Sequence, residues 1–462
     1  MIKINRIMIA GATSGTGKTT LSLGIMAALK RRDINVRPFK VGPDYIDPGF
    51  HKLVTGNNSY NLDSWMLKED IIKYLFHKNM DNMDMGVIEG VMGLYDGFGV
   101  ERNGIGSSAH ISKILKTPVI LVIDGKGMST SAAAMVLGYK EYDKDVDIQG
   151  VIINKVSGDY HYNLLKEAIE RDTGIKCLGY LPKDLNISLN SRHLGLIPAE
   201  EVDTLNDKID LLVDYIEKYV DLNGIIDISY NRETIKGQKD YMAPYRGYGE
   251  GIKLGIMRDK AFSFYYQDNI DLLMEMGIDI EYISPLKDQH LPDDLDGIYI
   301  GGGFPEVFGR ELEINQEFKH NLRNALEAGL PAYGECGGLM YLTESIEDLN
   351  QCNYEMVGFF PTKSLMTKRL QRFGYVEVET NDGINIRAHE FHHSKVLDNV
   401  KLNYQYRIMK KRKGQYVKTW NCGMKKKNVL AGYPHIHFYS NIDFIKGFID
   451  LCRAFRGGDT IE

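Results

Sequence analysis

The feature that most constrains the fold of this chain is a glycine-rich loop near its N-terminus. The apolar run Ile4–Ala10 leads into Gly11–Thr20, which reads Gly-Ala-Thr-Ser-Gly-Thr-Gly-Lys-Thr-Thr, and Thr19–Arg31 then carries apolar residues at helical spacing. A phosphate group needs several convergent amide donors, and glycines let the backbone approach it while the helix N-terminus adds its dipole. The order of strand, loop and helix therefore predicts a phosphate-binding loop.

Two side chains of this loop have chemistry that suits a nucleotide. Lys18 would neutralise charge on the β- and γ-phosphates of ATP, and Thr19 would offer its hydroxyl to Mg²⁺. Five residues separate Gly11 from Gly17 instead of the usual four, a spacing that resembles the loop of dethiobiotin-synthetase-like ATPases. The predicted ATP-binding residues are Gly11, Thr13, Gly15, Thr16, Gly17, Lys18, Thr19, Thr20 and Lys40.

The first half of the chain alternates short β-branched runs with longer amphipathic segments such as Thr19–Arg31 and Tyr160–Thr173. This alternation predicts an α/β fold with a doubly wound parallel sheet, whose ligand loops lie at the carboxyl ends of the strands. The predicted strands are Ile4–Ala10, Val36–Val41, Met85–Glu89, Val119–Asp124, Val151–Asn154 and Lys176–Leu181.

Acidic side chains follow the second and third predicted strands. A carboxylate beside a phosphate loop can hold Mg²⁺, and Lys40 could stabilise charge on a transferring phosphoryl group. For each carboxylate the alternative is a capping or turn role. Asn154 and Lys155, after the fifth strand, are weaker candidates for contact with the nucleotide base. The predicted metal ligands are Thr19, Asp47 and Glu89, and the candidates for substrate binding or phosphoryl transfer are Asp44, Asp47 and Tyr95.

A second α/β core is expected after residue 250. A chain of 462 residues is too long for one compact core, and 225–250 is polar, glycine-bearing and aperiodic. A strand is predicted to begin at Lys253, and a helix near Asp268–Met276 is followed by strands at Ile278–Ile283 and Gly297–Ile300. The predicted organisation is an ATP-binding domain at 1–224, a linker at 225–250, a second domain at 251–446 and a C-terminal helix or tail at 447–462.

The second core contains a candidate nucleophile. Cys336 lies in Gly-Glu-Cys-Gly-Gly where a short strand turns into a helix, and small residues on both sides of a nucleophile are what a sharp elbow requires. A helix N-terminus lowers the pKa of a thiol, and His435 supplies the distant imidazole that acyl transfer needs. The backbone amides predicted to form an oxyanion hole are those of Gly302, Gly303 and Gly337.

Other histidines and cysteines favour structural roles. His389, His392 and His393 could bind zinc, but they lack the i, i+4 spacing of a helical metal site. The five cysteines are an odd number without a Cys-x-x-Cys pair, which favours a reducing cytoplasm.

Charge and hydropathy exclude several classes of partner. The net charge of −6 disfavours nucleic acid and anionic membranes, and no stretch of about 18 apolar residues predicts a membrane span. Because the N-terminal residues run directly into the glycine loop, we expect no signal peptide. Residues 401–430 contain ten Lys or Arg and no acid, which is typical of a solvated face and, alternatively, of a docking surface for an acidic partner.

Several motifs occur in one order along nearly the whole chain. Together with the phosphate loop they resemble the cobyrinate a,c-diamide synthase family, in which an N-terminal dethiobiotin-synthetase-like ATPase domain precedes a class I glutamine amidotransferase domain. The motifs are Lys40–Pro48, Glu89–Gly97, Ser191–Leu196, Gly301–Glu306, Cys336, His389–Ser394 and His435–Phe438.

This resemblance implies a reaction and a set of substrates. The N-terminal domain would use ATP to phosphorylate the a and c acetate carboxylates of a corrin-type tetrapyrrole, as in cobalamin biosynthesis. The second domain would release ammonia from glutamine, with Cys336 forming a glutamyl thioester and His435 raising its nucleophilicity. The commoner amidotransferases carry glutamate two residues after this histidine, whereas here His437 occupies that position. A third, orienting acid is therefore missing or supplied from elsewhere, as in the cobyric-acid-type subgroup.

Two alternatives remain open at this point. The substrate of the same amidation could instead be nickel-sirohydrochlorin or metal-free hydrogenobyrinate, since no feature of the sequence distinguishes the central metal of the macrocycle. A partitioning-type regulatory ATPase would share the strand, loop and helix, but it would leave Cys336 and His435 unexplained.

Overall fold

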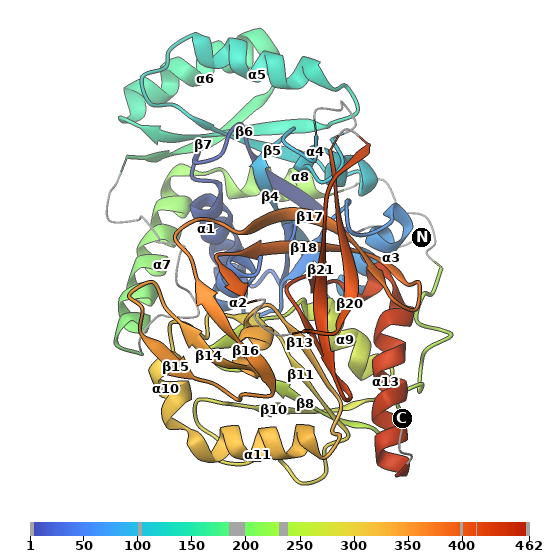
Figure 1. Ribbon diagram of the computed structural model, residues 1–462. Helices are drawn as coiled ribbons and strands as arrows, with labels where there is room; N and C mark the ends of the chain where they lie inside the picture. Colours follow the sequence, from blue (N-terminus) through green and yellow to red (C-terminus); the bar gives the residue numbers. More distant parts are fainter. Residues whose placement is uncertain are drawn as a thin grey trace. The chain divides into compact units, whose positions relative to one another are not determined.

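The computed structural model describes residues 4–99, 104–183, 199–230, 239–397, 401–412 and 414–458. The chain divides into two compact units, Met1–Asp240 and Tyr241–Glu462, so the division falls inside the predicted linker. Figure 1 shows the elements of both units along the chain. No helix among the described residues is long and apolar enough to cross a membrane.

The first unit contains a seven-stranded sheet with strand order β3-β2-β4-β1-β5-β6-β7. Every neighbouring pair in this sheet is parallel, which confirms the predicted fold class. The elements are β1 (Arg6–Gly11), α1 (Lys18–Arg31), β2 (Val36–Val41), α2 (Ile46–Thr55), β3 (Tyr60–Leu62), α3 (Glu69–Asn79), β4 (Met85–Gly93), α4 (Ser108–Ile114), β5 (Val119–Asp124), α5 (Ser131–Tyr142), β6 (Ile148–Val156), α6 (Asp159–Thr173), β7 (Lys176–Pro182), α7 (Ala199–Tyr219) and α8 (Leu222–Ser229).

Helices cover both faces of this sheet. Ile7 and Ile9 of β1 lie in one buried core with residues of α1, α7 and α8. Successive strand residues point to opposite faces, so Met8 and Ala10, which are equally buried, belong to the other face. In Figure 1, α5 and α6 lie together on the side of the sheet away from α1 and α7. This double winding leaves the carboxyl ends of the strands as the edge where loops can bind a ligand.

The register of the central strands aligns the predicted site residues. Lys40 of β2 pairs with Glu89 of β4, and Glu89 pairs on its other side with Ile9 of β1. Residues 10 and 11 then lead directly into the phosphate loop. Parallel pairing therefore brings Lys40, Glu89 and the loop to one edge of the sheet, although they are far apart in the sequence.

The second unit is also an α/β structure, but its main sheet contains both parallel and antiparallel strand pairs. Its elements are β8 (Lys253–Met257), β9 (Phe262–Phe264), α9 (Gln267–Glu275), β10 (Asp279–Ile283), β11 (Gly297–Ile300), β12 (Gly302–Gly303), α10 (Gly309–Ile314), α11 (Gln316–Glu327), β13 (Ala332–Glu335), α12 (Gly337–Leu342), β14 (Thr343–Glu347), β15 (Asn353–Glu355), β16 (Phe360–Met366), β17 (Arg372–Thr380), β18 (Asn385–His392), β19 (Ser394–Val396), β20 (Tyr404–Arg412), β21 (Gln415–Lys426), β22 (Val429–Gly432), β23 (His435–Ile436), the 3₁₀ helix η3 (Phe438–Ser440) and α13 (Ile442–Gly457).

The main sheet of this unit has the strand order β10-β8-β11-β13-β22-β21-β20-β17-β18-β23. The first five strands of this order, β10, β8, β11, β13 and β22, pair in parallel. From β22 to β23, every neighbouring pair is antiparallel. β13 ends at Glu335 opposite Gly432 of β22, and β23 begins three residues after Gly432. Cys336 and His435 therefore both follow the carboxyl ends of adjacent parallel strands.

Helix boundaries depart from the predicted domain organisation at two places. α8 continues to Ser229, into the predicted linker 225–250, because Leu222 and Ile225 are buried in the core of the first unit. α13 runs across the predicted boundary between residues 446 and 447, because its apolar face, including Phe448 and Ile449, is buried on both sides of that point. The short strand β3 was not predicted, and the motif Ser191–Leu196 lies outside the described residues.

Candidate active sites

The phosphate loop requires glycine for steric reasons. Gly15 and Gly17 have φ angles of +80° and +86°, and α1 begins immediately after Gly17. A Cβ atom on Gly17 would lie 2.1 Å from the Nδ2 atom of Asn154. That amide nitrogen donates a 2.7 Å hydrogen bond to the carbonyl oxygen of Thr16. Asn154 therefore supports the loop backbone, while Lys155 Nζ donates to the carbonyl oxygen of Gly15 at 3.1 Å.

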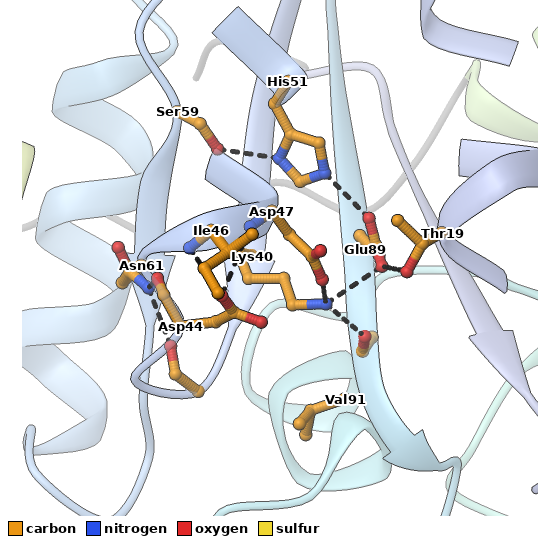
Figure 2. A network of polar contacts seen from close by, with 12 residues as sticks. Thr19, Lys40, Asp44, Ile46, Asp47, His51, Ser59, Asn61, Glu89 and Val91 are labelled. Atoms are coloured by element: carbon orange, nitrogen blue, oxygen red, sulfur yellow. Dashed lines mark hydrogen bonds and ion pairs between the residues drawn. The ribbon is translucent and has the colours of Figure 1, made fainter. Parts of the chain in front are cut away.

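A polar network lies next to the start of α1 (Figure 2). Glu89 Oε1 accepts hydrogen bonds from the Thr19 hydroxyl at 2.7 Å and from Lys40 Nζ at 2.9 Å. Lys40 Nζ also lies 2.5 Å from Asp47 Oδ2 and donates to the carbonyl oxygen of Gly90 at 3.2 Å. The structure thus joins the three predicted metal ligands in one network: Asp47 and Glu89 contact the buried Lys40, and Thr19 contacts Glu89.

His51 is a member of this network that the sequence analysis missed. Its Nε2 lies 2.8 Å from Glu89 Oε2, and its Nδ1 lies 2.9 Å from the Ser59 hydroxyl (Figure 2). The His51 side chain is fully buried. One sequence feature could have pointed to His51: it lies four residues after Asp47, and this spacing places both side chains on one face of α2.

The ionic groups of this network perturb one another. Burial would raise the pKa of Glu89, but Lys40 and the hydrogen bond from His51 lower it well below its ordinary value. Burial, together with the Glu89 carboxylate, raises the pKa of Asp47 to about 6. Burial would lower the pKa of Lys40, yet Glu89 and Asp47 raise it, so Lys40 stays charged. Burial and the Lys40 ammonium lower the pKa of Lys18.

Asp44 and Tyr95 lie near the loop but have local partners. Asp44 Oδ1 accepts hydrogen bonds from the backbone nitrogens of Ile46 at 2.8 Å and Asp47 at 3.2 Å, which caps the start of α2. The Tyr95 hydroxyl donates to the carbonyl oxygen of Tyr139 at 2.7 Å, and the hydroxyl of Tyr139 donates to the carbonyl oxygen of Ala12. Hydrogen bonds through Tyr139 therefore link Tyr95 to the phosphate loop.

In the second unit, Cys336 sits in a strained turn. Its φ and ψ angles are +47° and −100°, a conformation that is costly for a residue other than glycine, and α12 begins at the next residue. A Cβ atom on Gly338 would lie 2.3 Å from the carbonyl oxygen of Ile300, and one on Gly334 would lie 2.9 Å from Cβ of Ala431. The small residues around Cys336 are thus required for a nucleophile elbow.

The triple-glycine segment lies against both halves of the cysteine–histidine pair. A Cβ atom on Gly302 would lie 2.5 Å from Cε1 of His435, and one on Gly337 would lie 3.0 Å from the backbone nitrogen of Gly303. Burial would lower the pKa of His435, but Cys336 and Glu335 raise it to about 10. The structure therefore brings together the residues that the sequence assigned to the nucleophile, the base and the oxyanion hole.

Glu335 and His437 have partners that the sequence did not indicate. Glu335 Oε2 lies 3.7 Å from His435 Nδ1, and Glu335 is 1% exposed. His437 is also buried, and its Nε2 lies 3.6 Å from Oδ2 of Asp268 on α9.

The histidines considered as zinc ligands do not all share one face of β18. His389 and His392 are three residues apart on β18, so their side chains leave opposite faces of the strand, and the His392 ring stacks on Tyr433 at 3.7 Å. Within the described ranges, no group of three or more His, Cys, Asp and Glu side chains is placed to hold a metal ion.

The other cysteines lack an elbow. Cys177, Cys422 and Cys452 are buried, and burial raises the pKa of each thiol. Cys352 is exposed.

Comparison with known proteins matches each unit to a sequence family. The CobQ/CobB/MinD/ParA nucleotide binding domain matches residues 7–197, and the CobB/CobQ-like glutamine amidotransferase domain matches residues 253–442. A cobyrinate a,c-diamide synthase from Caldanaerobacter subterraneus subsp. tengcongensis is 46% identical over 97% of this chain and 98% of its own length. Proteins of the same name from Listeria innocua and Clostridium acetobutylicum are 47% and 45% identical, over 95% and 96% of this chain and 97% and 99% of their own lengths.

The two units and their sites define a glutamine-hydrolysing, ATP-dependent carbon–nitrogen ligase. The near full-length identity places it more narrowly: the chain belongs to the cobyrinate a,c-diamide synthase family.

Proposed function

We propose that this chain converts the a and c acetate carboxylates of cobyrinate to amides, using ATP and ammonia released from glutamine. The observation that carries this proposal is the presence of two groups of candidate site residues in one chain: the loop with its buried acid–lysine network, and the elbow cysteine with its buried histidine. Each is suited to one half of a glutamine-dependent amidation.

The first site would activate the carboxylate. A carboxylate does not react usefully with ammonia, because its leaving group is oxide. If a carboxylate oxygen of the substrate attacks the γ-phosphorus of ATP, ADP leaves and an acyl phosphate forms; ammonia then displaces inorganic phosphate and gives the amide. The loop amides and Lys18 would bind the phosphates. Lys40, held between Asp47 and Glu89, would fix both carboxylates and offset negative charge near the transferring group.

The donor set of this network fits Mg²⁺. Magnesium is usually bound by one or two carboxylates together with phosphate oxygens and water, and it prefers oxygen ligands. Glu89, Asp47 and the Thr19 hydroxyl supply such oxygens beside the loop. When bound there, the ion would offset charge on the nucleotide phosphates.

The second site would release the ammonia. The Cys336 thiolate would attack the amide carbon of glutamine, and His435 would give a proton to the departing nitrogen, so that ammonia and a glutamyl thioester form. Water, deprotonated by His435, would then hydrolyse the thioester to glutamate and restore the thiol. The amides of Gly337 and of Gly302 or Gly303 would stabilise the oxyanion in both steps.

The identity of the tetrapyrrole is tested by the product. The purified chain is incubated with glutamine and Mg²⁺-ATP and with cobyrinate, hydrogenobyrinate or nickel-sirohydrochlorin in parallel, and the products are followed by mass spectrometry. We expect cobyrinate to gain two amides, with two equivalents of ADP and of glutamate. A preference for nickel-sirohydrochlorin or hydrogenobyrinate in kcat/KM would contradict the assignment of the substrate, and ATP hydrolysis without amide would contradict the assignment of the reaction.

Replacement of Glu89 tests the proposed metal ligands. Glu89→Gln removes a charge but preserves the shape of the side chain, so we expect the Mg²⁺ concentration for half-maximal amidation to rise about 10-fold or more. The matched control is Glu69→Gln, which changes an exposed carboxylate in the same unit. The measurement is a magnesium titration of both amidation and nucleotide binding. An unchanged titration of Glu89→Gln would indicate that Glu89 has only a structural role.

A further inference from the structure

The carboxylate that precedes the candidate nucleophile is held in a fixed orientation. Glu335 Oε1 accepts a 2.7 Å hydrogen bond from the Tyr333 hydroxyl and a 3.2 Å hydrogen bond from the backbone nitrogen of Ile436. Its other oxygen, Oε2, lies 3.7 Å from His435 Nδ1. Because Glu335 is 1% exposed, water cannot replace these partners freely. The fixed Oε1 thus leaves Oε2 next to the imidazole.

The position that usually carries the orienting acid is engaged elsewhere. His437, two residues after His435, is fully buried and lies 3.6 Å from Asp268 through its Nε2. Its ring packs beside Tyr266, with 5.0 Å between ring centroids. His437 and Asp268 form a second buried acid–histidine pair, which joins α9 to the start of η3, just after β23.

We propose that Glu335 is the positioning residue of His435, holding the imidazole through Nδ1 so that Nε2 exchanges a proton with Cys336. This inference rests on the proposed role of Cys336 and His435 in glutamine hydrolysis. Cys336, His435 and Glu335 then form a nucleophile–base–acid triad. Its acid comes from the strand before the nucleophile and not from the strand that carries the base. Glu335 does not touch glutamine in this arrangement and acts only through His435.

The charges around His435 support this assignment. Burial would lower its pKa, and Cys336 and Glu335 together raise it to about 10. On β18, burial and His435 lower the pKa of His389 to about 3, and burial raises the pKa of Glu390 to about 7. The phenols of Tyr265, Tyr299, Tyr333 and Tyr406 interact with Glu335, the imidazole of His392 interacts with His435, and the phenol of Tyr433 interacts with Cys336. The guanidinium of Arg372 and the ammonium of Lys410 interact with Glu390.

Removal of the Glu335 charge provides the first test. In Glu335→Gln, the amide oxygen can still accept the hydrogen bonds from Tyr333 and Ile436, but the negative charge beside His435 is lost. We expect kcat for glutamate release to fall about 100-fold with little change in KM, since proton transfer is impaired while glutamine contacts remain. Glu335→Asp restores the charge and should recover part of that loss. Ammonia-dependent amidation should stay at the wild-type rate.

The pH dependence of Cys336 reactivity provides a second test. If Glu335 had only a structural role, its replacement would leave this pH dependence unchanged. A carboxylate beside the imidazolium stabilises the thiolate–imidazolium pair. Its loss should shift the midpoint for alkylation of Cys336 by iodoacetamide to higher pH, by about one unit. Mass spectrometry of the peptides separates Cys336 from the exposed Cys352, whose profile should not change.

The matched control is Asp268→Asn, which removes the carboxylate of the neighbouring buried acid–histidine pair. We expect this variant to keep both the kcat for glutamine and the alkylation profile of Cys336. If Asp268→Asn shifts the profile and Glu335→Gln does not, the assignment is wrong. If Glu335→Gln lowers the melting temperature and the activity while the profile of the folded protein is unchanged, Glu335 has a structural role only. Glutamate release by Cys336→Ala would instead overturn the proposed function itself.

Discussion

Cys336→Ala should abolish glutamine-dependent amidation and leave ammonia-dependent amidation intact. Without the thiol no glutamyl thioester can form, so we expect glutamate release to fall at least about 10⁴-fold. The phosphate loop and its acid–lysine network lie in the other unit and are unchanged. Amidation with ammonium at alkaline pH, where more of the nitrogen is unprotonated, should therefore continue. The two activities are measured separately, as glutamate release and as ATP-dependent formation of diamide.

The control for this variant is Cys422→Ala, which removes a buried thiol that lacks the elbow and the histidine. It should retain the glutamine-dependent reaction if the protein stays folded. Loss of ammonia-dependent amidation in a folded Cys336→Ala protein would contradict the division of the reaction between two sites. His435→Ala should also lose most glutamine-dependent turnover. It should keep slightly more activity than Cys336→Ala, because the N-terminus of α12 still favours some thiolate at Cys336.

Lys18→Ala should abolish amidation with either nitrogen source, because both routes need the acyl phosphate. Lys18 is the first residue of α1 and follows Gly17 at the end of the loop. Its loss removes positive charge from the β- and γ-phosphates, and we expect kcat for amidation to fall about 10³-fold. The measurement is diamide formation with glutamine and with ammonium, together with the affinity for ATP.

Lys30→Ala is the matched control, because Lys30 is an exposed residue in the last turn of the same helix. It should amidate at the wild-type rate. Glutamate release in Lys18→Ala reports on the second unit and shows whether that unit remains folded. Near wild-type amidation by Lys18→Ala with ammonium would exclude the loop as the site of phosphoryl transfer.

Local patterns determined much of the first unit. The strands Val36–Val41 and Val119–Asp124 were predicted with the same bounds that the structure has. Val119–Asp124 is the nearly continuous apolar run that is typical of a buried parallel strand, whereas Val36–Val41 carries Arg37 and Lys40 among its apolar residues. β4 was predicted to end at Glu89 but continues to Gly93. The extension follows from pairing with β1, which is a long-range contact that no local pattern contains.

The site residues show the same division. Glycine spacing, the Lys-Thr pair and the small residues around Cys336 identified the loop and the elbow, because backbone geometry at those points admits few other residues. His51 gave little local signal, since one histidine on an amphipathic helix is most often a core residue. Its role depends on Glu89, which lies 38 positions away in the sequence and 2.8 Å away in the structure.

By itself, the sequence determined the class of chemistry: a phosphate loop before a helix, a cysteine in an elbow and a distant histidine. Only the tertiary structure decided which acids and bases lie together. It paired His435 with Glu335 and turned His437 toward Asp268. The physical reason is that motif spacing reflects local backbone constraints, whereas the partner of a buried charge depends on which strands and helices pack together, and charges on distant segments meet only after the sheet has formed.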